Sequence, residues 1–209
     1  MTSTFVQRAL RPVGVALTLI IAALAPRLGP VSAATSQASR QVMAAPFDRQ
    51  FIDMMVPHHQ SAVAMAQVAL TRARRPQIKS LARSIIADQD SEINQMKTWR
   101  KEWYGSSATP SIANMPMLPG MTMSMSGMMM AHDITSLKTA NPFDKAFIDA
   151  MMPHHQMAID AATLELQRGS HQQLKDLALS IIKGQSREEG LMQAYRELWY
   201  GGMGSMNGM

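Results

Sequence analysis

The chain of 209 residues contains no cysteine, which excludes disulfide bonds and thiolate metal sites. It also lacks an apolar segment of membrane-spanning length. The uncharged run Val13–Ala25 has only 13 residues, whereas a transmembrane helix needs about 20. No later segment approaches that length.

The short apolar run has the features of an export signal. Arg8 and Arg11 precede it, and small residues at 31–34 offer a cleavage site. We therefore expect residues 1–34 to be a signal peptide and the mature protein to be periplasmic or secreted. An uncleaved N-terminal anchor is the alternative. With cleavage, no stable membrane span would remain.

A strong excess of one charge is also missing. The whole chain has 20 Lys and Arg against 15 Asp and Glu, a net charge of +5. The expected signal contributes three arginines and no acid, so the mature chain would have 17 against 15, a net charge of +2. This balance does not indicate a nucleic-acid partner, which would need a basic stripe.

Methionine is abundant, with 21 residues. In a chain without cysteine, the thioether is the soft ligand that remains, and it suits Cu(I). A thioether carries no proton near neutral pH, so acid does not compete with the metal for it. This composition points to a soft metal ion.

The chain contains an internal repeat, because residues 46–105 and 142–201 match without a gap at an offset of 96. The segment Pro57–Gln60 (Pro-His-His-Gln) returns at 153–156. Apolar residues at helical spacing predict a hairpin in each copy, with helices from about Phe47 to Leu70 and from about Gln77 to Tyr104 in the first. One hairpin cannot bury its apolar face alone.

Two hairpins can bury their apolar faces together, which predicts an all-α fold, a four-helix bundle over residues 44–202. Residues 106–141 would then form a long methionine-rich crossover. For the helix ends we expect Asn141 as an N-cap, a capping box from Ser170 to Gln173, and Gly105 and Gly201 as C-caps.

The paired histidines follow a proline inside a helical pattern in both copies. If the first hairpin turns near residues 74–75, His58 and His59 lie level with Gln89 and Glu92. By the same arithmetic, His154 and His155 lie beside Gln185 and Glu188. Such a buried layer would be a metal site or a hydrogen-bond network without metal. Pro57 could alternatively start a separate helix.

Methionines near these histidines extend the predicted donor set, because imidazole nitrogen and thioether sulfur together suit copper or silver. The copies differ, since Met65 corresponds to Ala161 and Ser61 to Met157, so two sites could be unequal. The candidate ligands in the repeats are Met55, His58, His59, Met65, Glu92, Met96, Met151, Met152, His154, His155, Glu188 and Met192.

A second group of methionines lies outside the predicted helices, among Gly, Ser, Pro and Thr, which are typical of flexible chain. Closely spaced thioethers there could gather around one Cu(I) or Ag(I) ion. An adaptable surface for an apolar partner is the alternative. The candidates are Met115, Met117, Met121, Met123, Met125, Met128, Met129, Met130 and His132 in the linker, and Met203, Met206 and Met209 in the tail.

The sequence around the paired histidines resembles domain-of-unknown-function family 305. The matching segments are Phe51–Gln60, followed by Ala62 and Met65-Ala66, and Ile148–Gln156 in the second copy. Ala161 departs from this pattern. The resemblance covers about residues 44–201. It implies a ferritin-like four-helix bundle and a role in periplasmic copper binding and tolerance.

Together these features predict a protein without enzymatic activity that binds copper, as Cu(I) or Cu(II), or silver. It would sequester the ion, deliver it to other copper-handling proteins of the envelope, or confer copper tolerance. A metallo-oxidase is one alternative, but di-iron bundles need Glu-x-x-His motifs, and this sequence has none. The other alternative is an envelope interaction module with methionine-rich surfaces.

Overall fold

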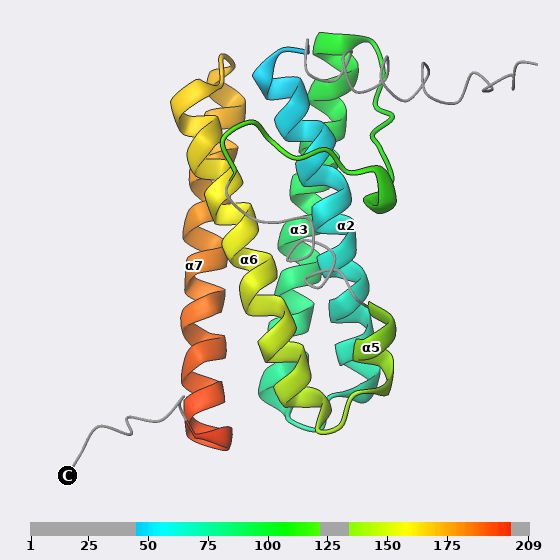
Figure 1. Cartoon of the computed structure of the whole chain (residues 1–209), viewed down its shortest axis with the longest axis vertical. Helices are drawn as coiled ribbons and strands as arrows, with labels where there is room; N and C mark the ends of the chain where they lie inside the picture. The colour runs from blue at the N-terminus through cyan, green and yellow to red at the C-terminus, as the bar shows by residue number, and fades with distance from the viewer. Residues whose placement is uncertain (1–44, 122–133, 202–209) are drawn as a thin grey trace, which may run out of the picture.

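The computed structural model describes residues 45–121 and 134–201, which fold into helices without any β-strand (Figure 1). The all-α prediction is therefore confirmed for this part of the chain. The elements in chain order are α2 (Phe47–Arg72), α3 (Pro76–Tyr104), the 3₁₀ turn η1 (Ile112–Asn114), α5 (Ile134–Thr139), α6 (Phe143–Arg168) and α7 (Gln172–Tyr200).

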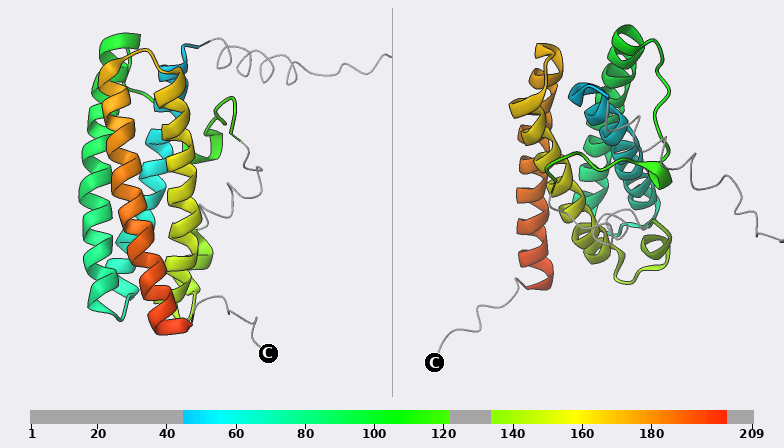
Figure 2. Two further views of the ribbon diagram at one scale, coloured as in Figure 1. Left: turned by 90° about the vertical axis from the view of Figure 1, so that its left-hand side faces the viewer. Right: turned by 45° about the horizontal axis from the view of Figure 1, so that its top comes forward.

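The four long helices form two antiparallel hairpins, α2 with α3 and α6 with α7 (Figures 1 and 2). The hairpins pack on each other mainly through α2 and α6, whereas α3 and α7 scarcely touch. Both α2 and α6 continue through their internal prolines, Pro57 and Pro153. The alternative that Pro57 begins a separate helix is thus wrong.

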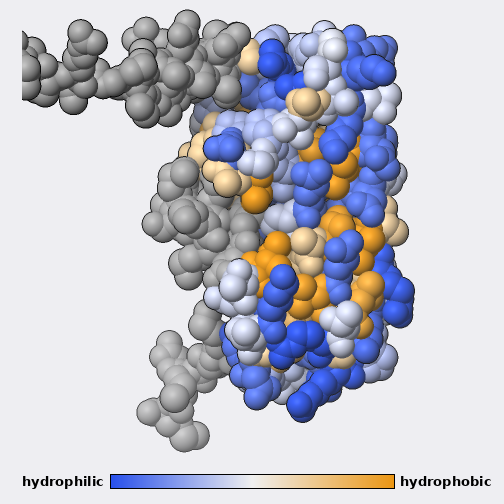
Figure 3. Space-filling model, turned by 90° about the vertical axis from the view of Figure 1, so that its right-hand side faces the viewer, coloured by the Kyte–Doolittle hydropathy of each residue, from blue (hydrophilic) through white to orange (hydrophobic). Residues whose placement is uncertain are grey.

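The apolar core consists of two clusters. On α2, cluster 1 contains Phe51, Ile52, Met54, Met55, Val56 and Val63, and cluster 2 contains Ala62, Met65, Ala66 and Ala69. Burial of large side chains such as Phe51 and Phe147 contributes about 1.5–3 kcal/mol each. Figure 3 shows apolar residues lying between hydrophilic ones on one face of the described surface.

Two carboxylates fasten the hairpins together, and this corrects the expected capping box. Helix α7 has His171 as its N-cap without a side-chain cap bond, so Ser170 does not cap it. Instead, the Ser170 and His171 backbone N–H groups donate to Asp48, at 2.7 and 3.0 Å. Asp144 likewise accepts from the Arg74 and Arg75 N–H groups, both at 3.0 Å. At the start of each of these helices, an aspartate of the other hairpin thus accepts the backbone hydrogen bonds that a local capping side chain would otherwise accept.

The other expected helix ends have mixed outcomes. Gly105 is the C-cap of α3 in the left-handed region, with φ of 79°, and Gly201 is the C-cap of α7 with φ of 72°. The Asn141 N-cap is wrong, because α6 begins at Phe143 with Pro142 as its N-cap. A helix can begin one residue away from the position that local capping preference predicts, because packing against neighbouring segments also determines where the chain enters the helix.

The described part of the linker is not the flexible chain that its composition predicts. Met115 and Leu118 are buried in cluster 1, and Met117 and Met121 pack against that cluster. Leu137 of α5, a helix that we did not expect, is buried in cluster 2. Thioether side chains adapt to irregular apolar surfaces, so a segment without helical periodicity can still be buried.

Candidate metal centre

The two hairpins meet at their paired histidines. His58 on α2 and His154 on α6 have ring centroids 3.8 Å apart, with an angle of 39° between the ring planes. All four imidazoles of the two pairs are completely buried. Since α2 and α6 form the main contact between the hairpins, this histidine pair lies in the interface between the repeats.

The outer histidine of each pair contacts a glutamate of its own hairpin. His59 Nε2 lies 2.7 Å from Glu92 Oε2, and His155 Nε2 lies 2.7 Å from Glu188 Oε2. Both contacts are those that the hairpin register predicts. A carboxylate on Nε2 orients the ring, as carboxylates do for metal-binding histidines.

The four rings and two carboxylates form one continuous polar row, which we call the histidine row. The centroid distance is 6.0 Å from His59 to His58 and 6.4 Å from His154 to His155. The order across the interface is Glu92, His59, His58, His154, His155 and Glu188. Sequence reasoning placed one half-site in each repeat but could not show that the halves join.

The row is not symmetric. Ser61 Oγ lies 3.1 Å from His154 Nε2, whereas the equivalent residue of the second repeat is Met157. At the outer histidines, the Nδ1 atoms of His59 and His155 are buried and have no hydrogen-bond partner among the described residues. These two nitrogens fit an ion, because a buried ring nitrogen otherwise loses its hydration without compensation.

The buried methionines lie in two sets, and each set contains methionines from both repeats. Met55 and Met96 share cluster 1, and Met151 and Met192 share cluster 2, as the register predicts. Met65 of the first repeat, however, lies in cluster 2. Ala161 therefore does not deprive the second repeat of a methionine, because the first repeat supplies one.

Conversely, cluster 1 contains a methionine of the second repeat that the sequence analysis did not predict as a ligand. Met157 of the second repeat lies in cluster 1 with Met54, Met55 and Met96, all fully buried. The mismatch of Ser61 with Met157 was the signal that could have found it. Met152, a predicted ligand, is only partly buried and packs against cluster 2.

The histidine row has one hydrogen-bonded carboxylate at each end. Over residues 45–121 and 134–201, no group of three or more His, Asp or Glu side chains is gathered closely enough to hold a metal ion. The donors near the row are thus imidazole nitrogens with one carboxylate on each side, flanked by thioether sulfurs. This set fits copper or silver better than a hard cation.

Behind the row, the helices α3 and α7 leave a groove of about 540 Å³ between them. Glu92 and Glu188 line it together with Gln89 and Gln185, whose amides are nearly buried. The hairpin register places both glutamines beside the histidines, but it could not show that they share a groove.

A separate buried acidic group lies at the α6–α7 turn. Asp48 accepts a hydrogen bond from the His171 side chain, and burial together with the Asp48 carboxylate raises the pKa of Glu165 to about 9. His171 also stacks on Trp103, with ring centroids 3.7 Å apart. At the equivalent turn of the first repeat, Arg75 lies over the ring of Trp199.

Several predicted residues lie outside the described part of the chain, so their placement stays a prediction. They are the expected signal 1–34, the linker residues Met123, Met125, Met128, Met129, Met130 and His132, and the tail residues Met203, Met206 and Met209. In the part that is described, no helix is long and apolar enough to cross a membrane.

The fold and the row define a four-helix protein made of two hairpins with paired histidines at their interface. The chain belongs to the family described as Domain of unknown function (DUF305), whose model matches residues 48–196. The resemblance seen in the sequence is thereby confirmed.

Solved structures of a protein named CopM are similar to this chain. Its Cu(I)-bound, silver-bound and Cu(II)-bound forms are 38%, 38% and 41% identical, with TM-scores of 0.60, 0.60 and 0.62. These matches cover 73–74% of this chain and 97–98% of CopM.

Two further matches are more limited. A putative secreted DUF305 protein from Streptomyces coelicolor has a TM-score of 0.61 at 23% identity, covering 78% of this chain and 98% of that one, and so shares the fold. An uncharacterized protein of Acanthamoeba polyphaga mimivirus is 41% identical over 51 residues, which is 24% of this chain and 34% of the viral protein. The chain thus spans about a third of that curated relative.

Proposed function

We propose that this protein is an exported copper-binding protein that takes up Cu(I) or Cu(II), and also Ag(I), as cargo. The observation that carries the proposal is the histidine row. A glutamate contacts each outer imidazole, and buried methionines belong to both cluster 1 and cluster 2. CopM, at 38–41% identity, is described in copper-bound and silver-bound forms.

The two donor types suit the two oxidation states. Imidazole nitrogen with a carboxylate suits Cu(II), and buried thioethers suit Cu(I) and Ag(I). The ion is held and passed on, so no catalytic step is proposed. Sequestration, copper tolerance and delivery to other envelope proteins are the outcomes that fit such binding, with periplasmic or secreted localisation.

The test is a titration of the purified protein with Cu(II) against a competing chromophoric chelator, repeated with Cu(I) and with Ag(I). We expect Glu92→Gln and Glu188→Gln to weaken binding about 10- to 100-fold, the usual effect of removing the carboxylate behind a ligand histidine. Glu102→Gln is the matched control, because Glu102 is an exposed glutamate on the same helix as Glu92.

Replacing His59 and His155 together with leucine should remove whole equivalents of metal from the row. His171→Gln changes a histidine outside the row and should leave the number of equivalents unchanged. Unaltered affinity and stoichiometry in the glutamate and histidine variants would refute the proposed site. Iron-dependent oxygen consumption by the wild type would instead favour the metallo-oxidase.

A further inference from the structure

The groove between α3 and α7 contains buried polar groups that the rest of the fold does not explain. Gln89 and Gln185 are 2% and 3% exposed, and both atoms of each amide lack a hydrogen-bond partner among the described residues. Glu188, 4% exposed, bonds His155 through Oε2, while its Oε1 also lacks a partner. Burying such a group is unfavourable when nothing replaces its hydration.

These groups line one cavity, and their chemistry selects a cation. The groove of about 540 Å³ is lined by Gln89, Glu92, Gln185 and Glu188, with Asp88 and Asp176 nearer its rim. None of its lining residues is basic. The adjacent Arg187 is paired with Asp88, at 4.0 Å. Carboxylate and amide oxygens of residues that line a cavity are ligands for a divalent ion.

The same two glutamates connect the groove with the histidine row. Glu92 and Glu188 line the groove, and their Oε2 atoms lie 2.7 Å from His59 and His155. The imidazoles themselves are completely buried, so an ion must pass other groups to reach them. In the left view of Figure 2, α3 and α7 run along the same face of the molecule, and residues of both helices line the groove.

We propose that this groove is a cation site with oxygen ligands, through which a hydrated divalent ion such as Cu(II) reaches the histidine row. The ion would exchange water for the oxygens of Gln89, Gln185, Glu92 and Glu188, and then for the imidazole nitrogens. The inference rests on the proposed copper binding. It adds the position at which the ion first binds and the route by which the ion enters.

Two glycines of α7 allow a controlled test. Gly184 lines the groove, Gly190 does not, and a Cβ added at either position meets no atom within 4 Å. Gly184→Phe therefore fills the groove without a clash in the backbone. Gly190→Phe is the matched control, because both changes replace a helical glycine by the same residue.

The measurement is the rate at which Cu(II) quenches the tryptophan fluorescence after rapid mixing, since Trp99 lines the groove. We expect Gly184→Phe to slow loading of the row at least tenfold and to leave the number of equivalents finally bound at the histidine row unchanged. Gly190→Phe should load like the wild type. Loading of Gly184→Phe at the wild-type rate would overturn the inference, even if the protein binds copper as proposed.

A second variant tests the oxygen ligands without filling the groove. Gln89→Leu with Gln185→Leu replaces unpaired amides by apolar groups of similar size, so the protein should remain folded. We expect this variant to lose the fast, weak phase of Cu(II) binding and to retain the tight phase at the histidines. An unchanged fast phase overturns the groove site. Absence of copper binding in the wild type would refute the proposed function itself.

Discussion

His58 and His154 have ring centroids 3.8 Å apart, with the ring planes tilted by 39°, although they occupy the same position in two repeats separated by 96 residues. Each repeat thus contributes half of one histidine row. A change at one end can alter binding at the other, because both inner imidazoles share the interface between α2 and α6. Copper binding and the association of the hairpins should be coupled.

The methionine exchange predicts which residues act together. Met65 shares cluster 2 with Met151, whereas Met55 of its own repeat lies in cluster 1. In double-mutant cycles with leucine, Cu(I) affinity should show coupling of about 0.5–3 kcal/mol between Met65 and Met151 and none beyond about 0.5 kcal/mol between Met65 and Met55. Stability should change by less than about 1.5 kcal/mol, because Met and Leu have similar volumes.

The measurement is a competition titration with Cu(I), with thermal unfolding as the control for packing. Equal coupling of Met65 to both partners would contradict the exchange between the repeats.

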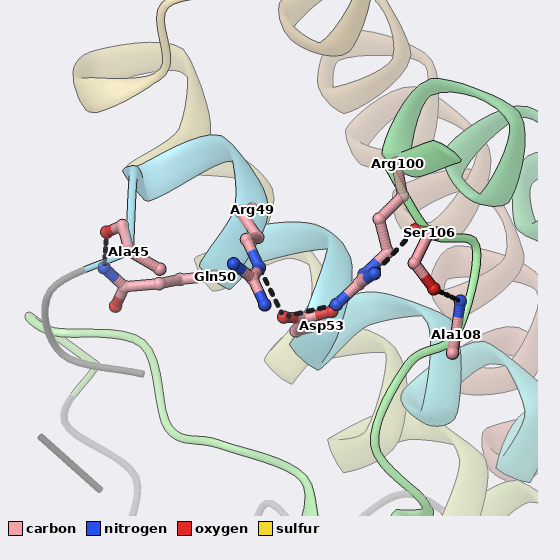
Figure 4. A network of polar contacts seen from close by, with 7 residues as sticks. All are labelled: Ala45, Arg49, Gln50, Asp53, Arg100, Ser106 and Ala108. Carbon is pink, nitrogen blue, oxygen red and sulfur yellow. Dashed lines mark hydrogen bonds and ion pairs between the residues drawn. The ribbon is translucent and has the colours of Figure 1, made fainter. Parts of the chain in front are cut away.

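An ion pair fixes the register of each hairpin, but only the first is well buried. Arg100 Nε lies 2.6 Å from Asp53 Oδ1, and its Nη1 donates to the Ser106 carbonyl at 2.6 Å (Figure 4). The equivalent pair, Asp149 with Arg196, is also at 2.6 Å but has side chains that are 35% and 21% exposed.

We therefore predict unequal effects of the same substitution. Asp53→Ala leaves a buried guanidinium unpaired and should destabilise the protein by about 3–5 kcal/mol. Asp149→Ala should cost about 1 kcal/mol or less, because water screens that pair. Urea unfolding measures both, and equal losses would show that burial does not decide the difference.

Glu165 and Gly169 occupy adjoining space at the end of α6. A Cβ on Gly169 would lie 1.9 Å from Glu165 Oε1, and the first repeat has Ala69 and Ala73 at the equivalent positions. Gly169→Ala should therefore destabilise the protein by about 1–3 kcal/mol. Gly190→Ala, with open space around it, should instead stabilise by up to about 1 kcal/mol.

Adding Glu165→Ala to Gly169→Ala recreates the pair found in the first repeat and should recover part of the lost stability, because the contact of the new Cβ with the carbonyl oxygen of residue 165, at 2.7 Å, remains. Thermal unfolding of the single and double variants checks this. Purely additive effects would mean that the two residues do not compete for space.

The raised pKa of Glu165 predicts a pH dependence of folding. Its pKa is about 9 in the folded protein, against an ordinary 4.5, because burial and the Asp48 carboxylate disfavour its charge. Between these values the folded chain binds a proton that the unfolded chain has lost. Stability should therefore fall as pH rises from about 5 to 9.

Glu165→Gln removes this titration while keeping a donor for Asp48, so its stability should fall less over the same pH range. Free energies of unfolding at several pH values measure the difference between the two proteins. Parallel curves would show that Glu165 does not titrate in this window. Tyr104 lies in the same surroundings, and burial with the nearby Asp48 carboxylate raises its pKa to about 12, above the window.

The sequence determined the features that depend on contacts within one hairpin. Apolar residues at helical spacing gave the four long helices, and the ungapped repeat showed that they form two similar hairpins. The position of the turn placed Glu92 beside His59 and Glu188 beside His155, since an antiparallel pair has a fixed register. These contacts follow from local periodicity and chain reversal.

Only the tertiary structure decided how the hairpins face each other. The contact of His58 with His154, the exchange of Met65 and Met157, and the groove beside Gln89 and Gln185 all depend on it. The physical reason is that the two surfaces lie far apart in the chain, so no short turn fixes how they align with each other. Their orientation is set by the fit of side chains across α2 and α6, which a single sequence does not display.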